Sequence, residues 1–200
     1  MIKYIICDVG GILFQGANTL AADIAHDILG EMTNEGEKEY ISYRPLLQTG
    51  RKTTKEFFTY LIKKYSLKKS VDEIYTQWLS VYKANAVLNP EIVELIQKLK
   101  THYKVIGFSN TIDLHGNYNK KVGNYSILDK IFLTYEMGFL KPDSEAYEFI
   151  LNSLNTKPEE CIFIDDREEN TAAAESLGIK SIKFDNNKQL KESLKKLGVV

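Results

Sequence analysis

The sequence carries carboxylate, hydroxyl, amide and ammonium side chains that each follow a short apolar run or precede a predicted helix. They are Asp8, Ser109, Asn110, Lys141, Asp165 and Asp166. Because ligands of parallel sheets bind where the strands end, we expect all six to lie at one edge. Three carboxylates in one site repel each other unless a cation neutralises them, and oxygen ligands favour Mg²⁺. The residue types therefore predict a magnesium-dependent site for phosphoryl chemistry.

Each of these side chains suits a step of phosphoryl transfer. Asp8 is the candidate nucleophile, since carboxylates form acyl phosphates in such chemistry. Ser109 would donate a hydrogen bond to a phosphoryl oxygen, and Lys141 would supply positive charge where negative charge develops. Asp165 and Asp166 would hold the metal that bridges to the phosphate. Taken singly, most of these residues are equally typical of turns or helix caps, so the prediction depends on the ordered set.

Two glycines follow the candidate nucleophile closely. Gly10 and Gly11 have no side chain, which lets backbone N–H groups approach a phosphoryl oxygen. The residues predicted to bind substrate are Gly10, Gly11, Ser109, Asn110 and Lys141.

The segments that position this site alternate between short apolar runs and helix-length amphipathic stretches. Continuous apolar runs are typical of strands buried on both faces of a parallel sheet. The predicted strands are 4–7, 104–108, 131–133, 161–164 and 181–184. Between them, Asn89 with Pro90 and Asp143 are expected to begin helices, and Gly178 is expected to close one. This alternation predicts an α/β fold with a doubly wound parallel sheet.

Residues 15–86 interrupt the alternation. They contain no convincing strand, but they carry helical stripes such as Phe57, Leu61 and Tyr65. We expect residues 15–86 to form a small helical cap, inserted after the first strand into a core of residues 1–14 and 87–200.

The composition is that of an ordinary globular protein. With 44% hydrophobic residues and a net charge of −1, nothing indicates a nucleic-acid or anionic-membrane surface. No apolar stretch is long enough to cross a bilayer, and the first strand leaves no room for a signal peptide. Cys7 and Cys161 lie in strand-like runs and are expected to be buried, reduced thiols. These features predict a cytoplasmic protein.

Four segments in this order resemble the motifs of the haloacid dehalogenase-like hydrolase superfamily. They are Asp8–Leu13, Phe108–Thr111, Lys141–Asp143, and Ile164–Asp166 with Asn170. Within it, the chain looks most like the phosphatases that include sugar-1-phosphate phosphatases and the amino-terminal domain of soluble epoxide hydrolases. Supporting segments are Leu114-His115 and Thr49-Gly50 before Thr54, Glu56 and Phe57. The substrate implied is a small phosphorylated metabolite, such as a sugar phosphate.

The resemblance also implies a Rossmann-like core, an inserted helical cap and Mg²⁺. It assigns Asp8 as nucleophile and metal ligand and Asp166 as a further ligand. Asp165 is implied to be a ligand or a close neighbour of the metal, and the Gly10 carbonyl would complete the set.

Gly10 is also where the chain departs from the family. Phosphatases of this family usually carry a second Asp there, which acts as general acid and then as general base. Without it, a dehalogenase- or phosphonatase-like reaction stays open, as does a catalytically weak module that only binds a phosphorylated ligand. Retention of both Asp165 and Asp166 argues against a metal-free dehalogenase.

Other polar residues are weaker candidates. His115 could reach the site from the helix after Ser109, but a structural role is the simpler interpretation; His26 and His102 are taken as structural. Arg51 and Lys52 could face an anionic substrate, although a solvated surface is the default. Trp78, Tyr75 and Tyr82 are expected in the cap core.

Overall fold

The computed structural model describes residues 1–15 and 33–199 of the chain. The strands are β1 (Tyr4–Cys7), β2 (Phe14–Gln15), β3 (Val87–Leu88), β4 (Lys104–Ser109), β5 (Lys130–Leu133), β6 (Cys161–Asp165) and β7 (Lys180–Lys183). The helices are α2 (Thr33–Gln48), α3 (Thr54–Tyr65), α4 (Val71–Asn85), α5 (Pro90–Leu99), α6 (Asp113–Val122), α7 (Thr134–Met137), α8 (Ser144–Leu154), the 3₁₀ helix η2 (Pro158–Glu160), α9 (Glu168–Ser176) and α10 (Asn187–Lys196).

The main sheet is parallel and has the strand order β5-β4-β1-β6-β7. Strand β1 is central and pairs with β4 on one side and β6 on the other. Because β1 is covered on both faces, its buried residues are continuously apolar rather than alternating with polar ones. The predicted α/β, doubly wound parallel sheet is confirmed, and each predicted strand lies within one residue of an observed one.

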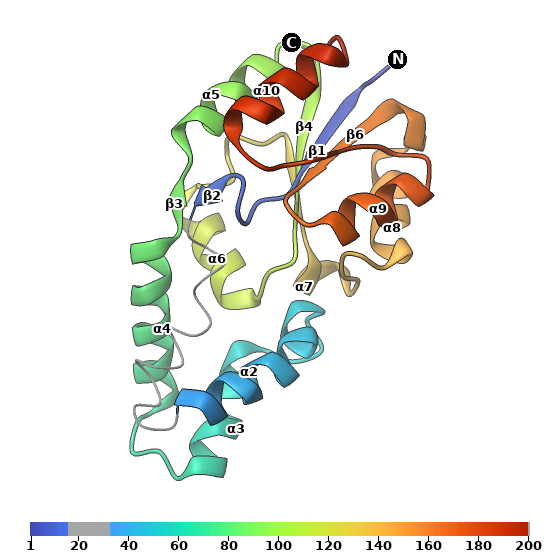
Figure 1. Cartoon of the computed structure of the whole chain (residues 1–200). Coiled ribbons are helices and arrows are strands. Elements are labelled where there is room, and N and C mark those ends of the chain that lie inside the picture. Colours follow the sequence, from blue (N-terminus) through green and yellow to red (C-terminus); the bar gives the residue numbers. More distant parts are fainter. Residues whose placement is uncertain (16–32, 200) are drawn as a thin grey trace.

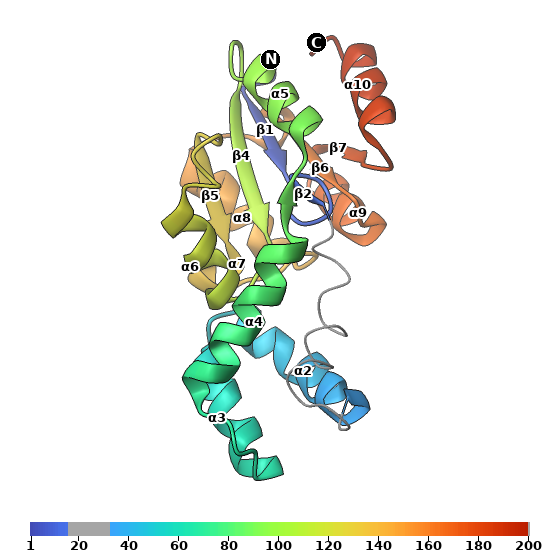
Figure 2. The same cartoon turned by 90° about the vertical axis from the view of Figure 1, so that its left-hand side faces the viewer.

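Helices cover both faces of this sheet (Figures 1 and 2). Ile5 and Cys7 of β1 pack with α5 and α10 on one face. Ile6, which points the other way, packs with α8 and α9 on the opposite face. The period-two alternation of side chains along a strand therefore divides the core into two layers.

Helices α2, α3 and α4 lie beyond the carboxyl edge of the sheet (Figures 1 and 2). They share a third hydrophobic cluster, whose buried residues are Tyr40, Leu47, Phe57, Phe58, Leu61, Ile74, Trp78 and Tyr82, with Ile112 and Leu114 from the start of α6. Capping boxes begin α3 at Thr53 with Glu56 and α4 at Ser70 with Glu73.

Two features of the fold differ from the sequence prediction. Strands β2 and β3 pair as an antiparallel two-stranded ribbon where the chain leaves and re-enters the sheet region. A short helix, α7, lies between β5 and Lys141. Both elements are too short to leave a periodic pattern in the sequence.

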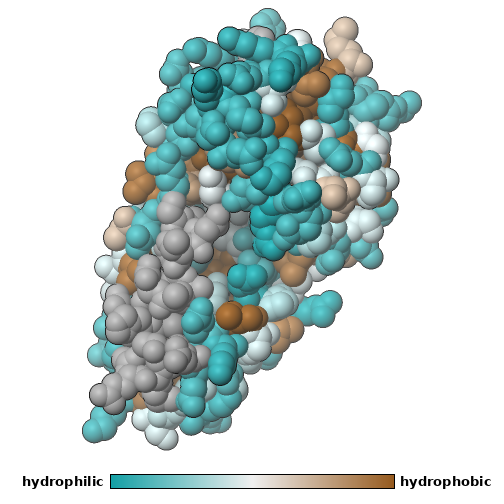
Figure 3. Space-filling view, viewed as in Figure 1, coloured by the Kyte–Doolittle hydropathy of each residue, from teal (hydrophilic) through white to brown (hydrophobic). Residues whose placement is uncertain are grey.

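Within the described part of the chain, every helix is too short or too polar to span a bilayer. On the face shown in Figure 3, hydrophilic side chains predominate and hydrophobic ones form only small, separate patches.

Candidate active site

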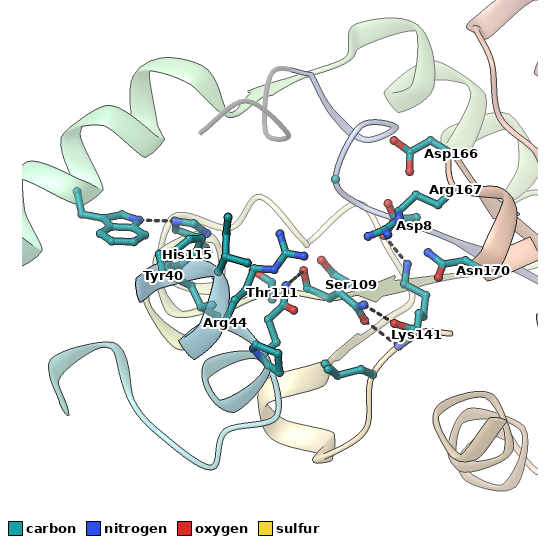
Figure 4. A pocket seen from close by; sticks show the side chains of 18 residues that line it. Asp8, Tyr40, Arg44, Ser109, Thr111, His115, Lys141, Asp166, Arg167 and Asn170 are labelled. Atoms are coloured by element: carbon teal, nitrogen blue, oxygen red, sulfur yellow. Dashed lines mark hydrogen bonds and ion pairs between the residues drawn. The ribbon is translucent and has the colours of Figure 1, made fainter. Parts of the chain in front are cut away.

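Six of the eight predicted site residues line one pocket at the carboxyl edge of the sheet, whereas Gly11 and Asp165 do not line it (Figure 4). The cavity has a volume of about 360 Å³, within the range of small-molecule sites. Of the residues predicted to act there, those that line it are Asp8, Gly10, Ser109, Asn110, Lys141 and Asp166. They come from the ends of β1, β4 and β6 and from the loop before α8, so the sheet edge brings together residues far apart in the sequence.

Lys141 is at the centre of a buried charge network. Its Nζ atom lies 2.6 Å from Asp8 Oδ1 and 2.7 Å from Asp165 Oδ2, and it donates to the Phe108 carbonyl at 3.0 Å. Burial alone would lower the pKa of Lys141, but the attraction of the two carboxylates outweighs it and raises that pKa. The side chain is therefore a fixed positive charge next to the candidate nucleophile.

Asp8 is held at the end of β1, where its backbone N–H donates to the Ile164 carbonyl at 2.8 Å. Burial raises the pKa of its carboxyl group to about 7, while the charge of Lys141 opposes this shift. Oδ1 accepts the hydrogen bond from Lys141. Oδ2 accepts no hydrogen bond from a described residue and is therefore the oxygen left to attack.

The two adjacent aspartates have different surroundings. Asp165 is fully buried, and its Oδ1 accepts hydrogen bonds from the Arg167 N–H at 3.0 Å and from Asn170 Nδ2 at 2.8 Å. With Lys141 on Oδ2, both of its oxygens are occupied. Asp166 is partly exposed and lines the pocket. Of this pair, Asp166 is the better placed to bind an added cation.

The carboxylates of Asp8, Asp165 and Asp166 each offer an oxygen within 4.8 Å of the others. One lysine cannot neutralise three such groups in a buried site. All of the available ligand atoms are oxygens, which Mg²⁺ prefers. The residues present therefore fit a divalent cation.

Two residues predicted to bind substrate have polar atoms that are engaged within the protein. Asn110 donates to the Lys141 carbonyl at 2.8 Å and accepts from the Lys141 N–H at 3.0 Å, so its amide holds the backbone of the lysine. The Gly11 N–H, predicted to approach a phosphoryl oxygen, donates to the Phe14 carbonyl at 2.9 Å. Gly11 has a φ of 77°, and the tight turn that it allows uses this amide.

Ser109 and Gly10 stay available to a ligand. The Ser109 hydroxyl lines the pocket at the end of β4, and it makes no hydrogen bond with a protein group in the described chain. Gly10 lines the pocket beside Asp8. A phosphoryl group bound against Asp8 would therefore meet one hydroxyl donor and one ammonium group.

His115 lines the pocket on the side away from Asp8 (Figure 4). Its Nε2 accepts a hydrogen bond from Trp78 Nε1 at 3.0 Å, and its ring stacks on Tyr82 at 3.9 Å between centroids. Burial lowers the pKa of His115 to about 3. The imidazole is therefore neutral at physiological pH, with its proton on Nδ1. Trp78 and Tyr82 belong to the hydrophobic cluster of α2–α4, as predicted.

Helix α2 contributes pocket residues that the sequence did not single out. Arg44 lines the pocket together with its neighbours Tyr40 and Gln48. The cap cations that were considered lie elsewhere: Arg51 borders a neighbouring cavity, and Lys52 pairs with Glu56 at 3.0 Å. A stripe at positions 40, 44 and 48 follows the helical repeat and was the available signal. His26 lies outside the described residues.

Comparison with protein families gives a match over most of the chain. The family described as haloacid dehalogenase-like hydrolase matches residues 2–178. A D-ribitol-5-phosphate phosphatase of Bacteroides thetaiotaomicron is 22% identical over 97% of both chains. The drimenol cyclase of Aspergillus calidoustus is 27% identical over 97% of this chain, which spans only 36% of that protein.

Comparison of structures agrees with this family match. A HAD family enzyme from Bacteroides thetaiotaomicron, crystallised with magnesium and inorganic phosphate, superposes with a TM-score of 0.78. The two chains are 25% identical, and the match covers 92% of this chain and 95% of the other.

Proposed function

The chain belongs to the haloacid dehalogenase-like hydrolase family, and we propose that it hydrolyses phosphomonoesters of small metabolites, sugar phosphates among them. The observation that carries the proposal is the placement of Asp8, Lys141 and Asp166 around one pocket with the Ser109 hydroxyl. The similar ribitol-phosphate phosphatase, and the similar enzyme crystallised with magnesium and phosphate, support this reaction class.

In the proposed reaction, Asp8 Oδ2 attacks phosphorus and the bond to the ester oxygen breaks. The leaving alcohol departs with that electron pair and takes its proton from water. Water then attacks phosphorus in the aspartyl-phosphate, which releases inorganic phosphate and restores the Asp8 carboxylate. The Ser109 hydroxyl donates to a phosphoryl oxygen, and the positive charge of Lys141 stabilises the phosphoryl group, since both residues line the pocket with Asp8.

We assign the metal to Asp8, Asp166 and the Gly10 carbonyl. When bound, Mg²⁺ would polarise the phosphoryl group and offset the negative charge of the carboxylates. Asp165 is assigned to hold Lys141 in place, because both of its oxygens already accept hydrogen bonds. This assignment predicts that replacing Asp165 changes the position of Lys141 directly and the affinity for the metal only indirectly.

Gly10 leaves the first step without a general acid at the family's usual position. His115 does not replace it, because its lowered pKa keeps it neutral and a neutral imidazole is a poor proton donor. This favours substrates whose leaving group is stable as an anion. Gly10 is also the one observation in favour of the alternatives, a dehalogenase- or phosphonatase-like enzyme or a binding module.

We further propose that residues 15–86 act as a cap over a core of residues 1–14 and 87–200. Helices α2–α4 have a hydrophobic cluster that is separate from the two sheet layers, and α2 lines the pocket. A cap of this kind limits access to small substrates and excludes water when it closes.

The test is hydrolysis of p-nitrophenyl phosphate with Mg²⁺ and with EDTA, beside halide release from 2-haloacids. We expect phosphate release that needs Mg²⁺ and is lost in Asp8→Asn. Halide release without Mg²⁺ would favour the dehalogenase reaction. Absence of both activities, with phosphate still bound, would favour the binding module.

A further inference from the structure

One face of α2 forms a wall of the pocket opposite Asp8. The α2 residues that line the pocket are Tyr40, Ile41, Arg44, Pro45 and Gln48. Their spacing of three to four residues places them on one side of the helix. In Figure 4 the Arg44 side chain extends from this wall into the middle of the pocket. A charged group therefore enters the space that a substrate would fill.

No acidic residue in the described part of the chain pairs with the charge of Arg44. Of the three cations that line the described part of the pocket, Lys141 is paired with two carboxylates and Arg167 with Glu169. Arg44 makes no hydrogen bond or ion pair with a described residue, although its charge partly offsets the rise in pKa that burial gives the Tyr40 hydroxyl. A guanidinium group keeps its charge at any physiological pH and presents its donors in a planar fork that matches carboxylate and phosphate oxygens.

The described groups near Arg44 carry no charge. His115 presents its Nδ1–H, because its Nε2 already accepts from Trp78. Thr111 lies near Arg44 in Figure 4, and Gln48, which also lines the pocket, is one helical turn from Arg44 on α2. The acidic residues among the described lining, Asp8 and Asp166, belong to the opposite end. Among the described residues, this end of the pocket carries no carboxylate that would repel an anion, and it is therefore suited to one.

We propose that Arg44 is a specificity-determining residue that binds a second anionic group, a carboxylate or another phosphoryl group, on the leaving group of the substrate. This inference rests on the proposed function, which places the transferred phosphoryl group against Asp8, Ser109 and Lys141. The preferred substrates are then phosphorylated acids or bisphosphates rather than neutral phosphorylated alcohols. The pocket volume of about 360 Å³ admits a small leaving group between the two anion-binding ends.

The test compares substrates that differ only in the second anion. Phenyl phosphate, 3-carboxyphenyl phosphate and 1,3-phenylene bisphosphate share an aryl leaving group, so the missing general acid at Gly10 affects the three esters similarly. We expect kcat/KM to be higher for the two compounds that carry a second anionic group than for phenyl phosphate, mainly through a lower KM. The carboxylate and bisphosphate compounds show which anion is preferred.

The variant is Arg44→Met, with Arg44→Lys as the charge-conserving form and Arg51→Met as the matched control. Arg51 is likewise exposed and near the end of α2, but it borders a different cavity. Arg44→Met should reduce the preference for the anionic leaving groups roughly tenfold, as expected for losing a hydrogen bond to a charged group. Arg44→Lys should keep part of the preference, and Arg51→Met should keep all of it.

Three outcomes would overturn the inference. The native protein could show no preference, Arg51→Met could lose it equally, or Arg44→Met could slow all three esters by the same factor. The last result would mean that Arg44 binds the transferred phosphoryl group instead.

A binding measurement separates this inference from the proposed function. Calorimetric titration of phenylphosphonate and 3-carboxyphenylphosphonate needs no turnover, and the carboxylated compound should bind more tightly only when Arg44 is present. Failure to hydrolyse p-nitrophenyl phosphate would contradict the proposed function alone. Equal binding of the two phosphonates would contradict the role of Arg44 alone.

Discussion

Replacing Lys141 with methionine tests the charge network of the site most directly. The Lys141 side chain is 1% exposed, and it contacts Asp165, which is 0% exposed, and Asp8, which is 11% exposed. Methionine fills a similar volume but leaves both carboxylates without their cation. Removing one partner of a buried ion pair typically costs about 3–5 kcal/mol of stability. Two carboxylates lose their partner here, so we expect the loss of stability in metal-free Lys141→Met to lie at the upper end of that range.

The assay is urea unfolding at neutral pH, in EDTA and again in Mg²⁺. Because a bound cation would neutralise the carboxylates, Mg²⁺ should recover part of the lost stability in Lys141→Met. Lys183→Met is the matched control, since Lys183 pairs with Asp185 on the surface and its loss should leave stability nearly unchanged. Adding Asp165→Asn to Lys141→Met should also recover stability by removing one unpaired charge. The account fails if Lys141→Met in EDTA is as stable as the native protein.

Three further predictions concern the metal, the leaving group and pH. Asp166→Ala should weaken Mg²⁺ binding, measured by calorimetry, and abolish turnover, whereas Asp8→Asn should lose turnover and still bind substrate. Unchanged Mg²⁺ affinity in Asp166→Ala would contradict the assignment of Asp166 as a metal ligand. Turnover of phosphate esters should depend steeply on the pKa of the leaving group. Gly10→Asp should flatten that dependence, since Gly10 has no positive φ and general acid catalysis is typically worth about 10²–10⁴-fold. A shallow dependence in the native enzyme would reveal another acid. The pKa of His115 is lowered in the folded state, so below about pH 6.5 the unfolded chain binds more protons and the folded state loses stability as the pH falls towards 3. Between pH 7 and pH 5 this loss of unfolding free energy should be at most about 2 kcal/mol, and it should be smaller in His115→Gln. Equal pH profiles of stability for the two proteins would refute this prediction.

The strands and the pocket residues at their ends were accessible from the sequence for one physical reason. A strand buried on both faces must be apolar throughout, and a polar residue at its end marks the sheet edge. Asp8 follows β1, Ser109 ends β4 and Asp165 ends β6, so their convergence follows from parallel pairing in register. The same reasoning could not detect β2 and β3, because these two-residue strands pair through a contact between segments that are far apart in the sequence.

The use of individual polar atoms could not be predicted from the sequence. Asn110 looked like a ligand-binding residue, but its amide is engaged by the backbone of Lys141, 31 residues away. Gly11 looked like an anion-binding turn, but its N–H closes the turn with Phe14. Arg44 was missed in favour of Arg51, because only the packing of α2 decides which arginine faces the pocket. These outcomes depend on contacts that are distant in sequence.

The position of Arg44 relative to Asp8 is set largely by α6. This helix belongs to the sheet region, yet its residues contact both α3 and α4. Asp113 accepts a hydrogen bond from the Thr54 N–H at 3.0 Å, His115 accepts one from Trp78, and Asn119 donates one to the Tyr82 hydroxyl. All three contacts are polar and directional, so they fix the orientation of the helical cluster more narrowly than apolar packing alone. Since α2 packs in the same cluster through Tyr40 and Leu47, the distance between the two proposed anion-binding ends depends on α6. The length of substrate that the pocket accepts is then a property of this helix as much as of Arg44.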